Sequence, residues 1–225
     1  MLLLVTDTSG KHGSVALVRA GPASGSEIRL MESVPLAGGT FSAQLVPQIA
    51  GLLSKHGLHK KAIEGFIVIS GPGSFTGLRV GLAAIKALAE ILEKPIVPLS
   101  LLEVMAIAAN TEGNLLAVLD AGRGEVYTGE YRVDRGAARN LSEELRPRNA
   151  FLPAGRGLVV STADTGLAQI AREVGMTVHQ VTVDAESIAR LGWRKMQSGE
   201  TVAPEQLDAN YIRRSDAEIF SKPIS

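Results

Sequence analysis

Short apolar runs separated by turn-forming residues predict a small sheet at the beginning of the chain. Apolar residues dominate positions 2–5 and 14–18, and a polar, glycine-containing turn joins the two runs. Two such runs around a short turn are typical of a β-hairpin. Residues 28–34 are expected to add a third strand, and the Gly-, Ser- and Pro-rich stretch 20–26 is expected to form the loop before it.

Helical spacing of apolar residues replaces the strand pattern after residue 41. We expect Ser42 to cap a helix that runs to about His56, with Gly57 as its stop. Pro47 lies inside this segment and indicates either a kink or a later start of the helix. The expected buried face of this helix consists of Leu45, Ile49, Leu52 and Leu53.

A buried strand and a long helix follow in the middle of the chain. Residues 63–70 carry a dense apolar run, 71–73 form a turn, and 76–93 have the composition of a helix. Pro95 and Pro98 are expected to end that helix.

The second half repeats the order of strands before helices, and the polar stretch 140–156 is expected to be a loop. The expected elements are a helix at 101–109, strands at 115–119, 123–133 and 158–160, a helix at 167–174, a strand at 178–181 and a helix at 185–196. With a break near residues 99–100, this order predicts an α/β protein of two similar layers.

The helix at 76–93 has an unusual distribution of polar residues. Its charged residues fall in one narrow stripe, and almost every other position is apolar or small, which predicts a helix that is buried nearly all round. The stripe consists of Arg79, Lys86, Glu90 and Glu93. Opposite it lie Gly77, Gly81 and Ala84, which would let another backbone approach closely. Either the protein's own sheet and neighbouring helix cover this surface, or part of it meets a second chain.

Composition narrows the range of functions. Lys plus Arg and Asp plus Glu both number 23, so the chain lacks the basic excess of a protein that binds RNA by itself. It contains no cysteine, which excludes disulfides, thiolate metal sites and a cysteine nucleophile. The chain shows neither a signal-peptide pattern nor an apolar stretch long enough to span a bilayer, so no membrane association and a cytoplasmic location are expected.

Two turns are candidate sites for chemistry. The motif at 71–79 follows a strand and opens a helix, where free backbone N–H groups can bind an anion. It lacks the Lys-Ser/Thr pair of a phosphate-binding P-loop, and Ser74 or Thr76 as an ordinary helix cap also accounts for it. The turn Asp7-Thr8-Ser9 is suited either to nucleotide contacts or to local backbone hydrogen bonds. No histidine pattern typical of a zinc site is present, so no metal site is expected.

Several motifs together resemble the TsaB (YeaZ) family. They are the start LVTDTS at 4–9, the central GPGSFTGLRVG at 71–81, the stretch DAGRGEVY at 120–127 and the close PEQLDANYIRRSDAE at 204–218. Two positions depart from the family pattern: Phe41-Ser42 replaces a frequent His-Ser, and Gly122 replaces an Arg. These departures weaken any transfer of nucleotide contacts to the two positions.

The resemblance implies an actin/Hsp70-like (ASKHA) fold of two subdomains, 1–100 and 101–225, each with a mixed sheet and helices; the last residues would pack back on the first subdomain. It implies a non-catalytic subunit of the complex that transfers a threonylcarbamoyl group to an adenosine beside the tRNA anticodon. The implied partners are a catalytic TsaD-like subunit, a TsaE-like ATPase and, when the chain is alone, a second copy. Contact with tRNA would be indirect. No cofactor is expected on this subunit, although ATP or ADP is compatible with a complex interface. The metal-binding His-x-x-x-His pair of TsaD is absent here.

In the family, helices at the positions of 42–56 and 76–93 form the bundle with TsaD. The resemblance therefore places the partner interface at Leu45, Ile49, Gly73, Thr76, Gly77, Val80, Gly81 and Ala84. One alternative is an actin-fold ATPase or transferase with its own nucleotide site at Asp7, Thr8, Ser9 and the 71–77 turn. Another is a homodimeric small-molecule binder unrelated to tRNA.

Overall fold

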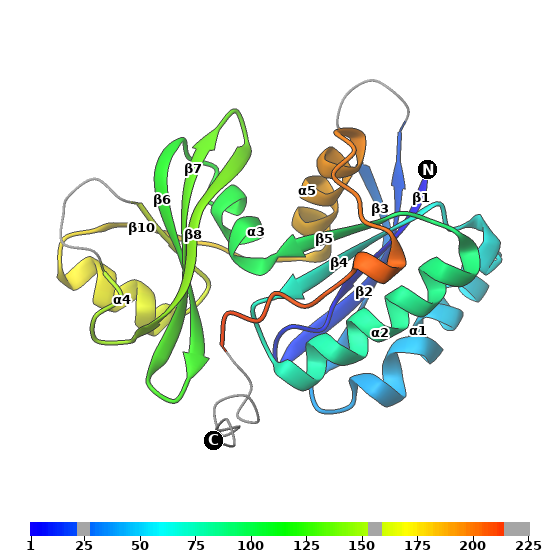
Figure 1. Ribbon diagram of the computed structural model, residues 1–225, viewed down its shortest axis with the longest axis horizontal. Coiled ribbons are helices and arrows are strands. Elements are labelled where there is room, and N and C mark those ends of the chain that lie inside the picture. The colour runs from blue at the N-terminus through cyan, green and yellow to red at the C-terminus, as the bar shows by residue number, and fades with distance from the viewer. Residues whose placement is uncertain (22–27, 153–158, 214–225) are drawn as a thin grey trace, which may run out of the picture.

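Each half of the chain forms one five-stranded mixed sheet (Figure 1). The computed structural model describes residues 1–21, 28–152 and 159–213 of the 225. Most of the loop expected at 20–26 therefore lies outside the described residues. We call the parts built on the two sheets the first lobe and the second lobe.

The sheet of the first lobe has the strand order β3-β2-β1-β4-β5. Its strands are β1 (Leu2–Asp7), β2 (His12–Ala20), β3 (Ile28–Ala37), β4 (Gly65–Gly71) and β5 (Ile96–Ser100). β2 runs antiparallel to β1 and β3, which confirms the predicted hairpin and third strand, whereas β4 and β5 pair in parallel. The prediction missed β5, where Pro98 was interpreted only as the end of a helix. A proline fits there because β5 is an edge strand, on which some N–H groups need no partner.

The sheet of the second lobe repeats this topology. Its strands are β6 (Gly113–Gly122), β7 (Glu125–Asp134), β8 (Ala137–Pro147), β9 (Val159–Thr162) and β10 (Thr177–Gln180), in the order β10-β9-β6-β7-β8. Counted from its own first strand, each sheet has the same order and the same parallel and antiparallel neighbours. The two similar α/β layers predicted from the sequence are confirmed. The loop predicted at 140–156 is wrong up to residue 147, because β8 is a mostly polar edge strand without an apolar alternation.

Helices cover both faces of each sheet (Figure 1). α1 (Phe41–Lys55) and α2 (Phe75–Leu92) pack on one face of the first sheet, and α5 (Ala185–Gln197) packs on the other. α3 (Leu101–Ala108) and α4 (Thr165–Glu173) cover opposite faces of the second sheet. Short 3-10 helices lie at η1 (Lys60–Ala62) and η2 (Pro204–Gln206). α3 and α5 belong to one apolar core that joins the lobes, so the chain returns to the first lobe from α5 onward.

The start of α1 differs from the prediction. Thr40, not Ser42, occupies the N-cap position, and its side chain makes no capping hydrogen bond. The helix begins at Phe41 and continues through Pro47 without a later start, because burial of its apolar face stabilises it. The cap of α2 agrees with the sequence: the Ser74 hydroxyl accepts a hydrogen bond from the Gly77 N–H at 3.3 Å.

α2 is buried on one face only, so the predicted burial nearly all round is wrong for the single chain. Its buried residues are Gly77, Leu78, Gly81, Leu82, Ile85 and Ala89. Ala83 and Ala87 are exposed, and Ile91 is 68% exposed. The sequence pattern was misleading because alanines suit a buried and an exposed position equally well.

Candidate functional site

The Asp7-Thr8-Ser9 turn at the end of β1 is held together by its own hydrogen bonds. The Asp7 carboxylate oxygen Oδ1 accepts from the Ser9 backbone N–H at 2.8 Å and from the Ser9 hydroxyl at 2.6 Å. Burial raises the pKa of Asp7 above its ordinary value, and the two hydrogen bonds from Ser9 oppose that rise. Asp7 therefore has the local structural role that an aspartate in a turn commonly has.

The glycine-rich motif at 71–81 packs directly against this turn. The Ser74 N–H donates to the Ser9 carbonyl oxygen at 2.7 Å. A Cβ atom on Gly73 would lie closer than 3.0 Å to the same oxygen, and one on Gly77 would lie that close to the Thr8 carbonyl oxygen. Gly81 faces the Thr8 hydroxyl in the same way. The glycines thus permit a close approach of α2 to the turn, as the sequence predicted, with the chain itself as the approaching backbone.

The two turns that the sequence singled out are therefore neighbours in the structure. Two N–H groups at the beginning of α2, those of Ser74 and Gly77, already have acceptors within the protein. Within the described residues, no group of three or more His, Asp or Glu side chains could hold a metal ion. No helix in the described ranges is long and apolar enough to cross a membrane.

An apolar surface remains on the outward side of α1 and α2, and we call it the α1–α2 face. It consists of exposed or partly exposed residues, namely Ala43, Val46, Pro47, Ala50 and Gly51 of α1 with Val80, Ala83, Ala84, Ala87, Leu88 and Ile91 of α2. Val46 is 59% exposed and Ile91 is 68% exposed. Apolar side chains gathered in this way on a surface often mark a protein–protein contact.

The residues predicted for a partner interface divide into two groups. Thr76 is exposed, and Val80 and Ala84 are partly exposed on the α1–α2 face. Leu45 and Ile49 are buried in the core of the first lobe; Gly77 and Gly81 are buried too, and Gly73 is partly buried against the turn. The sequence analysis did not name four exposed members of the face, Val46, Ala83, Ala87 and Ile91. The only available signal was the apolar character of both helices beyond one face.

A family model described as TsaD: tRNA N6-adenosine threonylcarbamoyltransferase matches residues 35–205. The chain belongs to the TsaD family. The chain is similar to proteins named TsaB or YeaZ, as the motifs indicated.

Two curated TsaB proteins and one solved YeaZ structure show the extent of the similarity. The tRNA threonylcarbamoyladenosine biosynthesis protein TsaB of Escherichia coli is 27% identical over an alignment of 230 residues, which covers 96% of each chain. TsaB of Bacillus subtilis is 31% identical over 137 residues, 60% of this chain and 57% of the relative. YeaZ from Pseudomonas aeruginosa superposes with a TM-score of 0.73 at 26% identity, over 93% of this chain and all of that one. The resemblance to TsaB and the actin-like fold it implied are confirmed.

Proposed function

We propose that this chain is a non-catalytic scaffold and activator subunit of the complex that transfers a threonylcarbamoyl group to adenosine beside the tRNA anticodon. It binds a TsaD-like catalytic subunit through the α1–α2 face. The names of the TsaB relatives place them in the biosynthesis of threonylcarbamoyladenosine, and the E. coli relative aligns over nearly all of this chain.

The observation that carries the proposal is a difference between two equivalent helices. α2 connects β4 to β5, and α4 connects β9 to β10, at the same place in the repeated topology. α4 exposes polar residues outward, among them Gln169, Arg172 and Glu173. α2 exposes its charged stripe there too, but beside the stripe it also exposes Ala83, Ala87 and Ile91. Because α4 shows that the fold does not need exposed apolar residues at this place, the apolar part of the exposed side of α2 calls for another explanation, and partner binding supplies one.

The contacts at the two turns favour a binding role over catalysis by this chain. Asp7 is engaged by Ser9, and the glycines that suggested a phosphate loop are required for close packing against Thr8 and Ser9. An ATPase or transferase with its own nucleotide site at these turns stays the alternative. It would show nucleotide turnover by the purified chain, which the scaffold role excludes.

The remaining partners follow from the same proposal. The α1–α2 face would pair with a second copy when the catalytic subunit is absent, because the same apolar surface would otherwise stay in water. A TsaE-like ATPase is the further partner, and ATP or ADP would bind at an interface of the complex. Contact with tRNA would be indirect, in keeping with the equal numbers of acidic and basic residues.

A charge placed on the α1–α2 face tests the proposal. We expect Ala87→Glu to weaken binding to the TsaD-like subunit of the same source by about 100-fold or more, because a carboxylate would be desolvated without a partner. Gln169→Glu is the matched control, since it adds the same charge at an exposed position of α4. Titration calorimetry gives the affinities, size exclusion with light scattering gives the assemblies, and circular dichroism checks folding. Unchanged binding by a folded Ala87→Glu chain would contradict the assignment of the interface to the α1–α2 face.

A further inference from the structure

The last described residues, 207–213, run from the first lobe to the second, and we call them the strap (Figure 1). The strap begins with Leu207, which is buried in the core of the first lobe. The Asn210 N–H donates to the carbonyl oxygen of Ser70, at the end of β4, at 2.8 Å. A Cβ atom on Gly71 would lie closer than 3.0 Å to the Asn210 carbonyl oxygen. The strap is therefore in tight contact with the first lobe.

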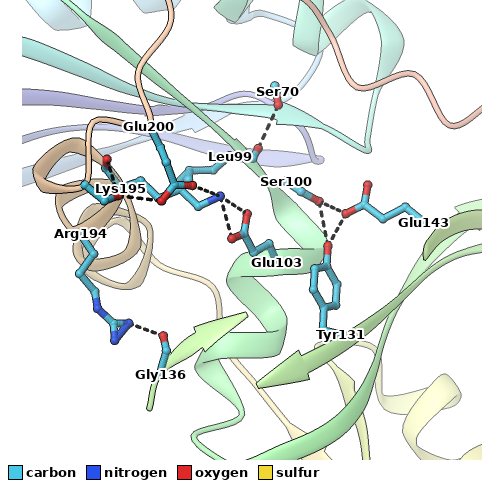
Figure 2. Close-up of polar contacts among 11 residues, drawn as sticks. Ser70, Leu99, Ser100, Glu103, Tyr131, Gly136, Glu143, Arg194, Lys195 and Glu200 are labelled. Atoms are coloured by element: carbon cyan, nitrogen blue, oxygen red, sulfur yellow. Dashed lines mark hydrogen bonds and ion pairs between the residues drawn. The ribbon is translucent and has the colours of Figure 1, made fainter. Parts of the chain in front are cut away.

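Glu143 of β8 joins the strap to the second lobe. Its Oε2 accepts from the Asn210 side-chain amide at 2.6 Å. Its Oε1 accepts from the hydroxyls of Ser100 and Tyr131 (Figure 2). Ser100 lies at the crossing between the lobes, where β5 ends and α3 begins, and Tyr131 lies in the second sheet. One carboxylate thus connects the crossing, the second sheet and the strap.

The pKa of Tyr131 favours the hydrogen bond that this residue donates to Glu143. Burial and the neighbouring Glu143 carboxylate raise the pKa of Tyr131 well above its ordinary value. Tyr131 therefore stays protonated and remains a hydrogen-bond donor to Glu143 at any physiological pH. Hydrogen bonds that a charged carboxylate accepts in a partly buried site are among the stronger ones in proteins.

Arg213 and Tyr211 of the strap make further contacts, one with each lobe. Arg213 donates to the carbonyl oxygens of Ala121 at 3.1 Å and Gly122 at 3.4 Å, and it pairs with the Glu125 carboxylate. These acceptors flank the β6–β7 turn of the second lobe. On the first lobe, the Tyr211 ring lies 5.0 Å from the Phe75 ring at the beginning of α2.

α5 makes further contacts between the lobes that do not involve the strap. The Lys195 ammonium of α5 pairs with the Glu103 carboxylate of α3 at 2.8 Å, and Arg194 of α5 donates to the Gly136 carbonyl oxygen (Figure 2). Glu103 lies one turn along α3 from Ser100, so these contacts adjoin the Glu143 cluster (Figure 2). Release of the lobes therefore requires that the contacts of α5 with the second lobe break as well as those of the strap.

From these contacts we infer that residues 207–213 act as a strap that locks the two lobes at a fixed angle. Glu143 is the residue of the second lobe that binds Asn210 of the strap. This goes beyond the proposed function, and it concerns the chain alone. The strap contacts the end of β4 through Asn210 and the β6–β7 turn through Arg213, so lobe opening requires release of these two residues. The locked angle also fixes the second lobe relative to α2, which carries the proposed partner surface.

A distance measurement between the lobes tests the strap. The chain contains no cysteine, so Lys60→Cys and Glu173→Cys, at exposed positions of the two lobes, give specific sites for spin labels. In this doubly labelled chain we expect pulsed electron paramagnetic resonance to give one narrow distance distribution. Asn210→Ala and Glu143→Gln should broaden the distribution about twofold or shift its mean. Asn210→Ala removes the hydrogen bond between the strap and the second lobe, and Glu143→Gln removes the charge and one of the two acceptor oxygens that Glu143 uses.

Glu144→Gln is the matched control. Glu144 is the next residue of β8, its side chain is 50% exposed, and it pairs with Arg146 rather than with the strap. We expect the distribution of this variant to equal that of the parent chain, and circular dichroism verifies that every variant is folded. A parent distribution already as broad as that of Asn210→Ala would overturn the inference, and so would folded Asn210→Ala and Glu143→Gln chains as narrow as the parent. Neither result bears on partner binding, which the Ala87→Glu experiment tests by itself.

Discussion

α2 and α4 occupy equivalent places in the two lobes, yet their outward faces differ in chemistry. Each helix buries an apolar face on its own sheet, which is what the repeated topology requires. On the other side α4 exposes Gln169 and Glu173, whereas α2 exposes Ala87 and Ile91 beside its charged stripe. Val174, just after α4, is also exposed, but single exposed apolar residues are common at protein surfaces. The comparison teaches that the apolar outward face of α2 is not a requirement of the fold.

The turn after β1 in the first lobe and the turn after β6 in the second lobe also differ. In the first lobe, Gly77 and Gly81 of α2 press against Thr8, so the turn is covered by the helix. In the second lobe, a Cβ atom added at Gly122 or Gly124 would meet open space. The first lobe therefore uses its glycines for close packing, whereas the second uses them for backbone conformation, since both have positive φ.

The largest effect on stability is expected where that packing is tightest. Gly77→Ala should lower the free energy of unfolding by about 2–3 kcal/mol, because the new Cβ would collide with the Thr8 carbonyl oxygen. Gly51→Ala is the control, since Gly51 lies in α1 with nothing within 4 Å of an added Cβ. It should raise the free energy of unfolding by up to about 1 kcal/mol through helix propensity. Urea denaturation measures both, and a Gly77→Ala chain as stable as the parent would contradict the packing role.

A smaller effect on the free energy of unfolding is expected from replacing Asp7, and it should differ from the effect of replacing Asp120. These acidic residues lie near the ends of β1 and β6. Burial raises the pKa of folded Asp7, so the folded chain holds this proton more tightly than the unfolded chain does. Stability then falls as the pH rises above the ordinary aspartate range. Asp7→Asn removes the buried charge and keeps an oxygen that accepts from Ser9, so it should raise the free energy of unfolding at neutral pH. The gain should shrink as the pH falls toward that range.

Asp120→Asn is the comparison for this experiment. The Asp120 side chain is 43% exposed and pairs with Arg148 at 3.2 Å, and such surface pairs contribute at most about 1 kcal/mol. We expect Asp120→Asn to be neutral or slightly destabilising at neutral pH. Denaturant titrations of both variants across the acidic to neutral range check the sign. A loss of stability in Asp7→Asn at neutral pH would show that the Asp7 charge stabilises the folded chain.

The sequence predicted most clearly the strands whose side chains are buried on both faces. β4 and the centre of β6 are continuous apolar runs, and a strand buried in this way has no polar alternation to obscure it. The edge strands β5 and β8 were missed, because Pro98 and the polar residues of β8 are tolerated where one side of the strand is unpaired. The repeated topology could be predicted only coarsely, since it depends on the strand pairing.

The candidate site could be predicted only in part from the sequence. The motifs identified the family, and the glycines opposite the polar stripe of α2 indicated a close backbone approach. Which backbone approaches, and which apolar residues stay outside, depend on how α1 and α2 dock on the sheet. Val46 and Ile91 have apolar side chains of the kind found in protein cores, and only the packed structure shows that they lie at the surface. The contacts of Glu143 with the strap join residues 67 positions apart, which no local pattern records.

The measurement that tests the α1–α2 face most directly is the reactivity of a single thiol. The chain has no cysteine of its own, so Ala87→Cys and Gln169→Cys each provide one site for a maleimide reagent. When a saturating TsaD-like subunit is added, we expect the labelling rate of Ala87→Cys to fall by about tenfold or more, because an interface excludes the reagent. The rate of Gln169→Cys should not change. Equal rates for Ala87→Cys with and without the partner, in a mixture in which light scattering shows the complex, would contradict the account.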